Sequence, residues 1–281
     1  MGQENIDFAI SARTLAIGRS AEILDFENNR IMKLYFGHVP DREIETEYEN
    51  SKVAFSSGAT SMKCYEKIRY GERVGIVFDK IEGISLTKLP DKKPAAFFSL
   101  SKILADLHLG LHNKKAEKLK DVKTFAAEML DLEPLSYLNR EEKDKARKII
   151  LDLPDGNSLL HMDFHPENII VAEDSFVVID WMTALKGHPA ADVASTQFLF
   201  QDAELWPGTP WLKIVFYNLV RKFLLKGYLK HYYSVSSVTP EEVKSWRLPI
   251  LLLRLGLWNI DSERPSLQKE IRELISLSDR Y

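Results

Sequence analysis

The stretch that decides the fold is Leu160–Val171, LHMDFHPENIIV, followed closely by Phe176–Trp181, FVVIDW. Short apolar runs of strand type carry three polar side chains: Asp163 after the first run, Asn168 five positions later and Asp180 at the end of the last run. The turn between the runs predicts a hairpin that brings Asn168 and Asp180 together, with Asp163 on the loop before it. Phosphoryl transfer needs a carboxylate that orients an attacking hydroxyl, and an amide and a carboxylate that hold magnesium against phosphates. The stretch therefore indicates phosphotransfer chemistry.

The segment before residue 83 has the pattern of a small antiparallel sheet with one helix. Apolar runs separated by polar turns predict strands at 14–17, 21–26, 30–35, 62–69 and 73–81. A helix is predicted from about residue 40 to residue 57, where Gly58 ends it. We expect its inward face to consist of Ile44, Tyr48, Ser51 and Phe55.

Beyond residue 83 the apolar spacing becomes helical. One buried face is predicted from the spacing of Leu100, Leu104, Leu107 and Leu111. Further helices are predicted near 122–138, 141–151, 189–201, 210–233, 240–258 and 266–277. The chain is thus predicted to be an α+β protein with a small antiparallel-sheet lobe, residues 1–82, and a larger, mainly helical lobe, residues 83–281.

Three motifs follow one another in the second half of the chain. They are His161-x-Asp163-x-x-x-x-Asn168, Ile179-Asp180-Trp181 and Gly187-x-Pro189-x-x-Asp192-x-Ala194. Together they resemble the motifs of the aminoglycoside phosphotransferase and choline kinase group, relatives of protein kinases, and the resemblance extends over most of the chain. It implies a two-lobed protein-kinase-like fold, with ATP as the phosphate donor and Mg²⁺ as the cofactor. In such a fold residues 1–82 would be the nucleotide-binding lobe, and residues 83–281 would be the catalytic and acceptor-binding lobe.

The resemblance also implies a role for each polar residue of the motifs. Asp163 takes the place of the catalytic base, and Asn168 and Asp180 take the places of the magnesium ligands. Asp192 takes the place of the aspartate that braces the catalytic loop, and His161 has a supporting structural role.

A kinase also needs a strand lysine for the α- and β-phosphates and a helix glutamate that holds this lysine. Lys33 lies on the third predicted strand, where that lysine belongs. At about 100° per residue, Glu47 lies nearest the inward face of the following helix, so we expect it to be the partner, with Glu43 second. Gly18 and Ser20, between the first two strands, are the candidate phosphate loop, although a single glycine is weak support.

The stretch Gly75–Gly83, GIVFDKIEG, resembles the strand that leads to the family's interlobe hinge. By position, the backbone groups of Asp79 and Ile81 are expected to pair with adenine. Because these are backbone roles, the identity of the side chains does not test them.

Composition narrows the choice of partners and location. The formal net charge of −3 provides no basic field for a phosphate backbone, which argues against nucleic acid as a partner. Cys64 is the only cysteine, so no intrachain disulfide can form, and with no readable targeting signal a reducing cytoplasm fits best. The most apolar stretch, Leu248–Trp258, is far shorter than the ~20 residues of a membrane span and is predicted to be a buried helix, with no membrane partner. The oligomeric state is not indicated.

Two histidine patterns permit a metal interpretation. His161, Asp163 and His165 alternate, so on a strand they would share a face as zinc ligands, although no second ligand cluster supports a zinc hydrolase. His108 and His112 lie four residues apart on a predicted helix, and without identifiable partners they are interpreted as structural or exposed.

A small-molecule kinase that phosphorylates a hydroxyl group is the favoured function. Choline-like, sugar, macrolide and aminoglycoside acceptors all stay open, although residues 181–281 carry more basic than acidic residues, which weakens the aminoglycoside hypothesis. A protein Ser/Thr kinase is the alternative, disfavoured because no activation segment with an APE-type end follows Asp180. A catalytically silent nucleotide-binding scaffold is disfavoured because Lys33, Asp163, Asn168 and Asp180 are all retained.

Overall fold

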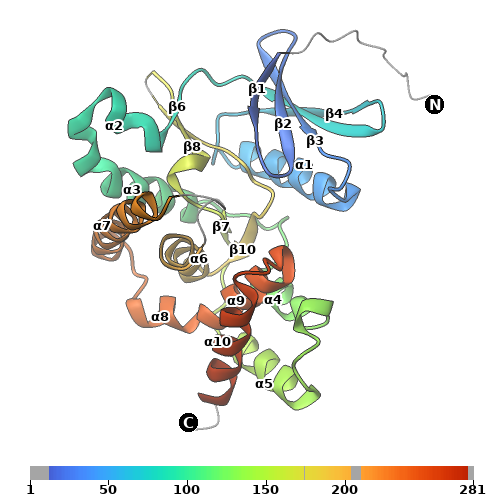
Figure 1. Ribbon diagram of the computed structural model, residues 1–281, viewed down its shortest axis with the longest axis vertical. Coiled ribbons are helices and arrows are strands. Elements are labelled where there is room, and N and C mark those ends of the chain that lie inside the picture. The colour runs from blue at the N-terminus through green and yellow to red at the C-terminus, as the bar shows by residue number, and fades with distance from the viewer. Residues whose placement is uncertain (1–12, 174, 204–209, 278–281) are drawn as a thin grey trace. The chain divides into compact units, whose positions relative to one another are not determined.

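The computed structural model describes residues 13–173, 175–203 and 210–277 (Figure 1). It consists of two compact units, each built from two stretches of chain: a sheet unit, Met1–Lys92 with Pro166–Thr183, and a helical unit, Lys93–His165 with Ala184–Tyr281. The predicted α+β fold, an antiparallel sheet plus a mainly helical part, is confirmed. The division into continuous lobes at residues 82 and 83 stays a prediction.

The main sheet of the sheet unit has five antiparallel strands and one long helix, as predicted. The elements are β1 (Thr14–Ile17), β2 (Ala21–Phe26), β3 (Arg30–Tyr35), α1 (Asp41–Ser56), β4 (Cys64–Tyr70) and β5 (Arg73–Asp79). The strand order is β1-β2-β3-β5-β4, and α1 lies beside β4 and β5 (Figure 1). Tight turns join the strands, with Asn28, Asn29 and Gly71 in the left-handed region.

The two faces of β3 pack against different neighbours, because side chains alternate along a strand. Ile31 and Tyr35 belong to the core cluster that also contains Ile44 of α1. Met32 and Leu34 point the other way and pack against Leu24 of β2. Lys33 shares the α1-facing side with Ile31 and Tyr35.

The inward face of α1 differs from the predicted one. Phe55 is 40% exposed, so the prediction was wrong for this residue, whereas Tyr48 is partly buried and packs against the core cluster that contains Ile44. The buried residues are Ile44, Glu47, Asn50, Ser51 and Ala54. The buried face of α1 therefore includes the polar residues Glu47 and Asn50. Both can be buried because each has a hydrogen-bond partner in this unit.

A second, three-stranded sheet completes the sheet unit. It has the order β6-β8-β9, from β6 (Ile84–Ser85), β8 (Ile169–Val171) and β9 (Phe176–Val178), with the short helices η1 (Leu86–Lys88), α2 (Leu89–Lys92) and η4 (Pro166–Asn168) beside it. Gly83 passes so close to β8 that a Cβ atom there would lie 2.4 Å from the carbonyl oxygen of Val171. Only glycine fits this approach.

The helical unit contains two short strands, β7 (Ser158–Leu160) and β10 (Leu185–Gly187), which pair with each other. Its helices are η2 (Pro94–Ser99), α3 (Leu100–His112), α4 (Val122–Met129), η3 (Glu133–Leu135), α5 (Arg140–Leu151), α6 (Pro189–Gln201), α7 (Trp211–Val235), α8 (Pro240–Ser245), α9 (Arg247–Trp258) and α10 (Arg264–Leu277). None of the described helices is long and apolar enough to span a membrane.

Two predicted helices of this unit are shorter in the structure. The helix predicted over 240–258 breaks at Trp246, which places Pro249 in the first turn of α9, where its missing N–H leaves no hydrogen bond unmade. The helix predicted over 122–138 ends at Met129, and Pro134 lies in the short helix η3. The stretch Leu248–Trp258, predicted to be a buried helix, is helical throughout, with residues 248–255 buried and Leu257 and Trp258 exposed.

Candidate functional site

In the sheet unit, Lys33 connects two carboxylates from distant parts of the chain. Its Nζ donates to Oε1 of Glu47 at 2.6 Å and to Oδ1 of Asp180 at 3.1 Å. Lys33 comes from β3, Glu47 from the buried face of α1, and Asp180 from the segment after β9. Glu43, the second choice for the partner, is exposed. The structure thus pairs Lys33 with Glu47.

The charges of this cluster depend on one another. Burial lowers the pKa of Lys33, but Asp180 and Glu47 outweigh it and raise this pKa above its usual value, so the lysine stays charged. Burial raises the pKa of Glu47, which Lys33 opposes. Because the two groups are 2.6 Å apart and Lys33 is charged, we assign an ion pair with ionised Glu47. Asp180 is the most open member, with 41% of its side chain exposed.

The β8–β9 hairpin places Asn168 next to Asp180. Ile169 pairs with Val178, and the N–H of Ile179 donates to the carbonyl oxygen of Asn168 at 3.0 Å, so Asn168 and Asp180 end up on neighbouring rungs. Asp180 has φ 66°, a left-handed conformation that costs a non-glycine residue roughly 1–2 kcal/mol. Conformations of this kind cluster at functional sites.

Asn50 is a residue of this site that sequence reasoning missed. It lies one turn after Glu47 on the buried face of α1, and its Nδ2 donates to the carbonyl oxygens of Trp181 at 3.1 Å and Met182 at 3.2 Å. It therefore fixes the segment directly after Asp180. A polar residue three positions from Glu47 was the available signal, since such residues share a helix face.

The two residues of the candidate phosphate loop lie in the turn between β1 and β2. The N–H of Gly18 donates to the carbonyl oxygen of Ala21, and the carbonyl oxygen of Ser20 accepts from Phe36. A Cβ atom at Gly18 would make only an ordinary contact of 3.5 Å, so steric fit does not require glycine there.

Asp79 and Ile81 lie at the end of β5 and just beyond it. The N–H of Asp79 donates to the carbonyl oxygen of Lys63, and its carboxylate accepts from the N–H of Lys63 and the hydroxyl of Tyr65. With its amide engaged, any adenine contact of Asp79 falls to its carbonyl group. Ile81 lies between β5 and β6, outside both sheets.

In the helical unit, Asp163 follows β7 on a loop. Met162 before it is left-handed, with φ 65°, and the buried His161 accepts a hydrogen bond at Nδ1 from the N–H of Asp163. Asp163 is half-buried, with its Oδ2 3.6 Å from Nε2 of His165. His161, Asp163 and His165 therefore do not share a strand face. Among the described residues, the ligand atoms that lie close enough together for a metal site belong to another group of residues and not to these three.

Side chains of helix α6 form hydrogen bonds with the backbone of this loop. The carboxylate of Asp192 accepts the N–H of His161 at 2.5 Å and the N–H of Met162 at 2.8 Å. Three residues further along α6, the hydroxyl of Ser195 donates to the carbonyl oxygen of Met162 at 2.6 Å. Residues three apart share a helix face, so one side of α6 fixes both sides of the left-handed residue.

The start of α6 explains the motif that precedes Asp192. His188 is the N-cap and accepts from the N–H of Ala190, and Pro189 occupies the first turn, where its lack of an N–H costs nothing. Gly187 packs so tightly that a Cβ atom would lie 2.4 Å from Cγ1 of Val122. The motif therefore fixes where α6 begins and, with it, the position of Asp192.

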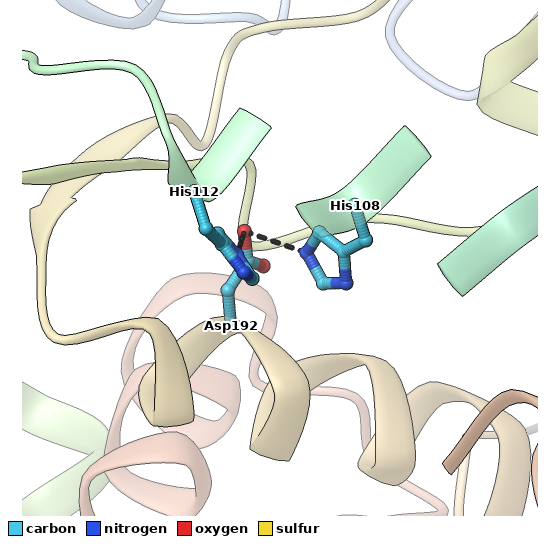
Figure 2. A group of neighbouring side chains, drawn as sticks. All are labelled: His108, His112 and Asp192. Atoms are coloured by element: carbon cyan, nitrogen blue, oxygen red, sulfur yellow. Dashed lines mark hydrogen bonds and ion pairs between the residues drawn. The ribbon is translucent and has the colours of Figure 1, made fainter. Parts of the chain in front are cut away.

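His108 and His112 of α3 lie against the same carboxylate, and both are buried (Figure 2). Nε2 of His112 is 3.3 Å and Nε2 of His108 is 3.0 Å from Oδ2 of Asp192. Burial raises the pKa of Asp192, but the two histidines outweigh it and keep this pKa well below its usual value. Sequence reasoning noted the histidine pair but missed its partner.

The residues at Asp180 suit a magnesium ion by their chemistry. Mg²⁺ prefers oxygen ligands and is usually bound by one or two carboxylates together with substrate phosphates. The partly exposed carboxylate of Asp180 and the neighbouring Asn168 offer such oxygens, beside the positive charge of Lys33 that suits phosphate. The residues present therefore fit a magnesium–nucleotide group.

Comparison with solved structures shows the same fold in several phosphotransferases. A thermostable mutant of aminoglycoside phosphotransferase APH(4)-Ia is 15% identical, with a TM-score of 0.63 and coverage of 96% of this chain and 95% of that chain. Choline kinase LicA from Streptococcus pneumoniae is 17% identical, with a TM-score of 0.55 and coverage of 96% and 94%. The streptomycin–ATP complex of APH(2")-IIa is 14% identical, with a TM-score of 0.54 and coverage of 94% and 91%.

Sequence comparison identifies the family. No curated protein matches the chain significantly in sequence. The sequence model of the phosphotransferase enzyme family matches residues 23–215, which is more than half of the chain and includes all three motifs. The chain belongs to the phosphotransferase enzyme family.

Proposed function

We propose that this protein transfers the γ-phosphoryl group of ATP to a hydroxyl group of a small molecule. The observation that carries the proposal is the placement of Lys33 between Glu47 and Asp180, at 2.6 Å and 3.1 Å. A partly buried lysine held by one buried and one open carboxylate suits a phosphate-binding cation beside a magnesium ligand. A mere structural ion pair does not need the second, exposed carboxylate.

Each residue has a distinct task in the proposed reaction. Lys33 binds the α- and β-phosphate oxygens, and Glu47 holds its ammonium group in place. Asn168 and Asp180 would hold Mg²⁺, which supplies positive charge to the phosphates when bound. Asp163 orients the attacking hydroxyl and accepts its proton as the new P–O bond forms and the bond to ADP breaks.

The acceptor is proposed only at the level of a chemical class. The related structures include an APH(4)-Ia complex with AMP-PNP and hygromycin B and a choline kinase, and hygromycin B and choline are both small molecules that carry hydroxyl groups. We therefore propose a small alcohol, with choline-like, sugar, macrolide and aminoglycoside compounds as the candidates to test.

The test is transfer of phosphate from MgATP to a panel of such alcohols, followed by ³¹P NMR so that a new phosphate ester is seen directly. Wild-type protein should form an ester with at least one class, and Asp163→Asn should form it ~10² times more slowly or slower still. Asp91→Asn, which changes an exposed aspartate on α2, is the matched control and should behave as wild type. Binding of MgATP without any ester would favour a silent scaffold, and phosphate on serine or threonine of a protein substrate would favour a protein kinase. Either result would contradict the proposal.

A further inference from the structure

Two tyrosines of α7 contact the two histidines that face Asp192. The hydroxyl of Tyr228 lies 2.7 Å from Nδ1 of His108, and the hydroxyl of Tyr232 lies 2.6 Å from Nδ1 of His112. Both tyrosines are fully buried, and within each helix the partners are four residues apart. Helices α3 and α7 therefore make the same Tyr–His contact twice, one turn apart.

The contacts of Asp192 decide which way the protons point. If Nδ1 of either histidine carried the only ring proton, the Nε2 lone pair would face the ionised carboxylate of Asp192 at 3.0 or 3.3 Å, which is repulsive. With the proton on Nε2, each histidine donates toward Asp192 and each tyrosine hydroxyl donates to Nδ1. Burial lowers the pKa of His108 to about 4, so this histidine is neutral near pH 7.

The tyrosines are suited to be permanent donors. Burial raises the pKa of both hydroxyls far above the physiological range, so each keeps its proton. Asp192 Oδ2 also accepts the N–H of His161, and a carboxylate oxygen has two lone-pair sites. Three N–H groups lie near this oxygen, and the one on Nε2 of His108 is not aligned for a hydrogen bond to it. The orientation of the His108 ring therefore depends most on its other contacts.

The histidines in turn touch the loop that carries Asp163. Asp192 holds the N–H groups of the two residues before it, as described above. The ring of His108 also stacks on Phe164, directly after Asp163, with 4.1 Å between ring centroids and 14° between planes. The hydroxyl of Thr196 donates to the carbonyl oxygen of Phe164 at 3.1 Å. Asp163 is therefore held from both sides by groups that meet at this cluster.

We propose that Tyr228 and Tyr232 are positioning residues: they hold the rings of His108 and His112 so that the Nε2–H of His112 stays hydrogen-bonded to Asp192 and the Nε2–H of His108 stays beside the same carboxylate, and thereby fix the loop that carries Asp163. The catalytic part of this inference rests on the proposed phosphotransfer, in which Asp163 is the base. The structural part does not depend on it.

The same cluster has a competing interpretation as a metal site. The ligand atoms of His108, His112 and Asp192 lie within 4.8 Å of one another (Figure 2). A metal ion on both Nε2 atoms would move the protons to Nδ1, and the tyrosines would then accept hydrogen bonds instead of donating them. The position of the histidine protons separates the two interpretations.

The first experiment is long-range ¹H–¹⁵N NMR of the full chain with labelled histidine. Wild-type protein should show His108 and His112 as the Nε2–H form with a hydrogen-bonded Nδ1. Tyr228→Phe should shift the Nδ1 signal of His108 alone, and Tyr232→Phe that of His112 alone. Tyr233→Phe is the matched control, because the hydroxyl partners of the two Nδ1 atoms are those of Tyr228 and Tyr232. Phenylalanine keeps the buried ring, and should a variant not fold, the wild-type spectrum alone decides the protonation pattern.

The second experiment measures the loop and the reaction. Loss of one neutral hydrogen bond should speed amide exchange at His161 and Met162 by about 2- to 10-fold and lower kcat by a similar factor, with KM for ATP unchanged. A merely structural role for the tyrosines would lower stability without this split between kcat and KM.

Several outcomes would overturn the inference. These are an Nδ1–H form in the wild type, stoichiometric zinc or another metal in the purified protein by elemental analysis, or variants with wild-type amide exchange at both loop positions. If no alcohol is phosphorylated at all, the proposed function fails, whereas the NMR and exchange results still show whether the tyrosines hold the loop.

Discussion

Replacing His108 by glutamine should change how the stability of the protein depends on pH. Burial, with a smaller contribution from His112, lowers the pKa of His108 from 6.5 to about 4 in the folded state. Between pH 4 and pH 6.5 the unfolded histidine therefore binds a proton that the folded one does not. By linkage the folded state is disfavoured in that range and gains stability as the pH rises, until the gain is complete above the unfolded pKa of 6.5.

The size of this change in stability follows from the difference between the pKa of His108 in the folded and the unfolded state. A difference between 6.5 and about 4 corresponds to roughly 3 kcal/mol in total, of which about 2 to 3 kcal/mol falls between pH 4.5 and pH 7.5. Glutamine has an amide N–H that can reach Asp192 but does not titrate in this range.

Urea denaturation from pH 4.5 to pH 7.5 measures the effect as a difference between proteins. Between pH 4.5 and pH 7.5 the free energy of unfolding of the wild type should rise by about 2 to 3 kcal/mol more than that of His108→Gln. His38→Gln, which changes an exposed histidine, is the control for the loss of a histidine as such. Parallel curves for wild type and His108→Gln would refute the reasoning, because they would mean that His108 binds protons equally in both states.

Three further predictions concern the sheet unit. Lys33→Ala and Glu47→Ala should each lower turnover, and the double variant should be less impaired than the product of the two effects. Free-energy losses in kcat/KM that simply add would mean that the two residues act independently. Asn50→Ala should weaken MgATP binding in calorimetry by about 1–3 kcal/mol, because two carbonyl groups after Asp180 lose their donor, and unchanged affinity would contradict this role. Gly83→Ala should lower the urea midpoint at constant m-value, by about 1–3 kcal/mol of stability, since its Cβ would lie 2.4 Å from the Val171 carbonyl oxygen; an unchanged midpoint would mean that the segment moves freely.

The strands and the lysine could be predicted from the sequence because they depend on local patterns. Alternating side chains and turn residues predict β1, β2 and β3 with their observed ends. The same alternation places Lys33 on the α1 side of its strand, and helical geometry favours Glu47 over Glu43. Both inferences need only spacing within one or two neighbouring elements.

What the sequence did not reveal depends on contacts between distant segments. The spacing from Glu47 places Asn50 on the same helix face, but the carbonyl groups that Asn50 holds belong to residues more than a hundred positions away, which no local pattern identifies. Likewise the histidine pair of α3 has no readable role until α6 brings one carboxylate oxygen of Asp192 against the Nε2 atoms of both rings. The buried face of α1 was misjudged for the same reason: hydrophobicity favoured Phe55, whereas tertiary partners favour Glu47 and Asn50.

The most direct test of the proposed function separates nucleotide binding from chemistry in two single variants. Asp180→Ala should lose most magnesium-dependent affinity for ATP in calorimetry. Asp163→Asn should keep that affinity while turnover with the identified alcohol falls by ~10² or more, the scale of a positioned general base. Unchanged MgATP binding in Asp180→Ala, or wild-type turnover in Asp163→Asn, would contradict the assignment of these residues and with it the proposed phosphotransfer.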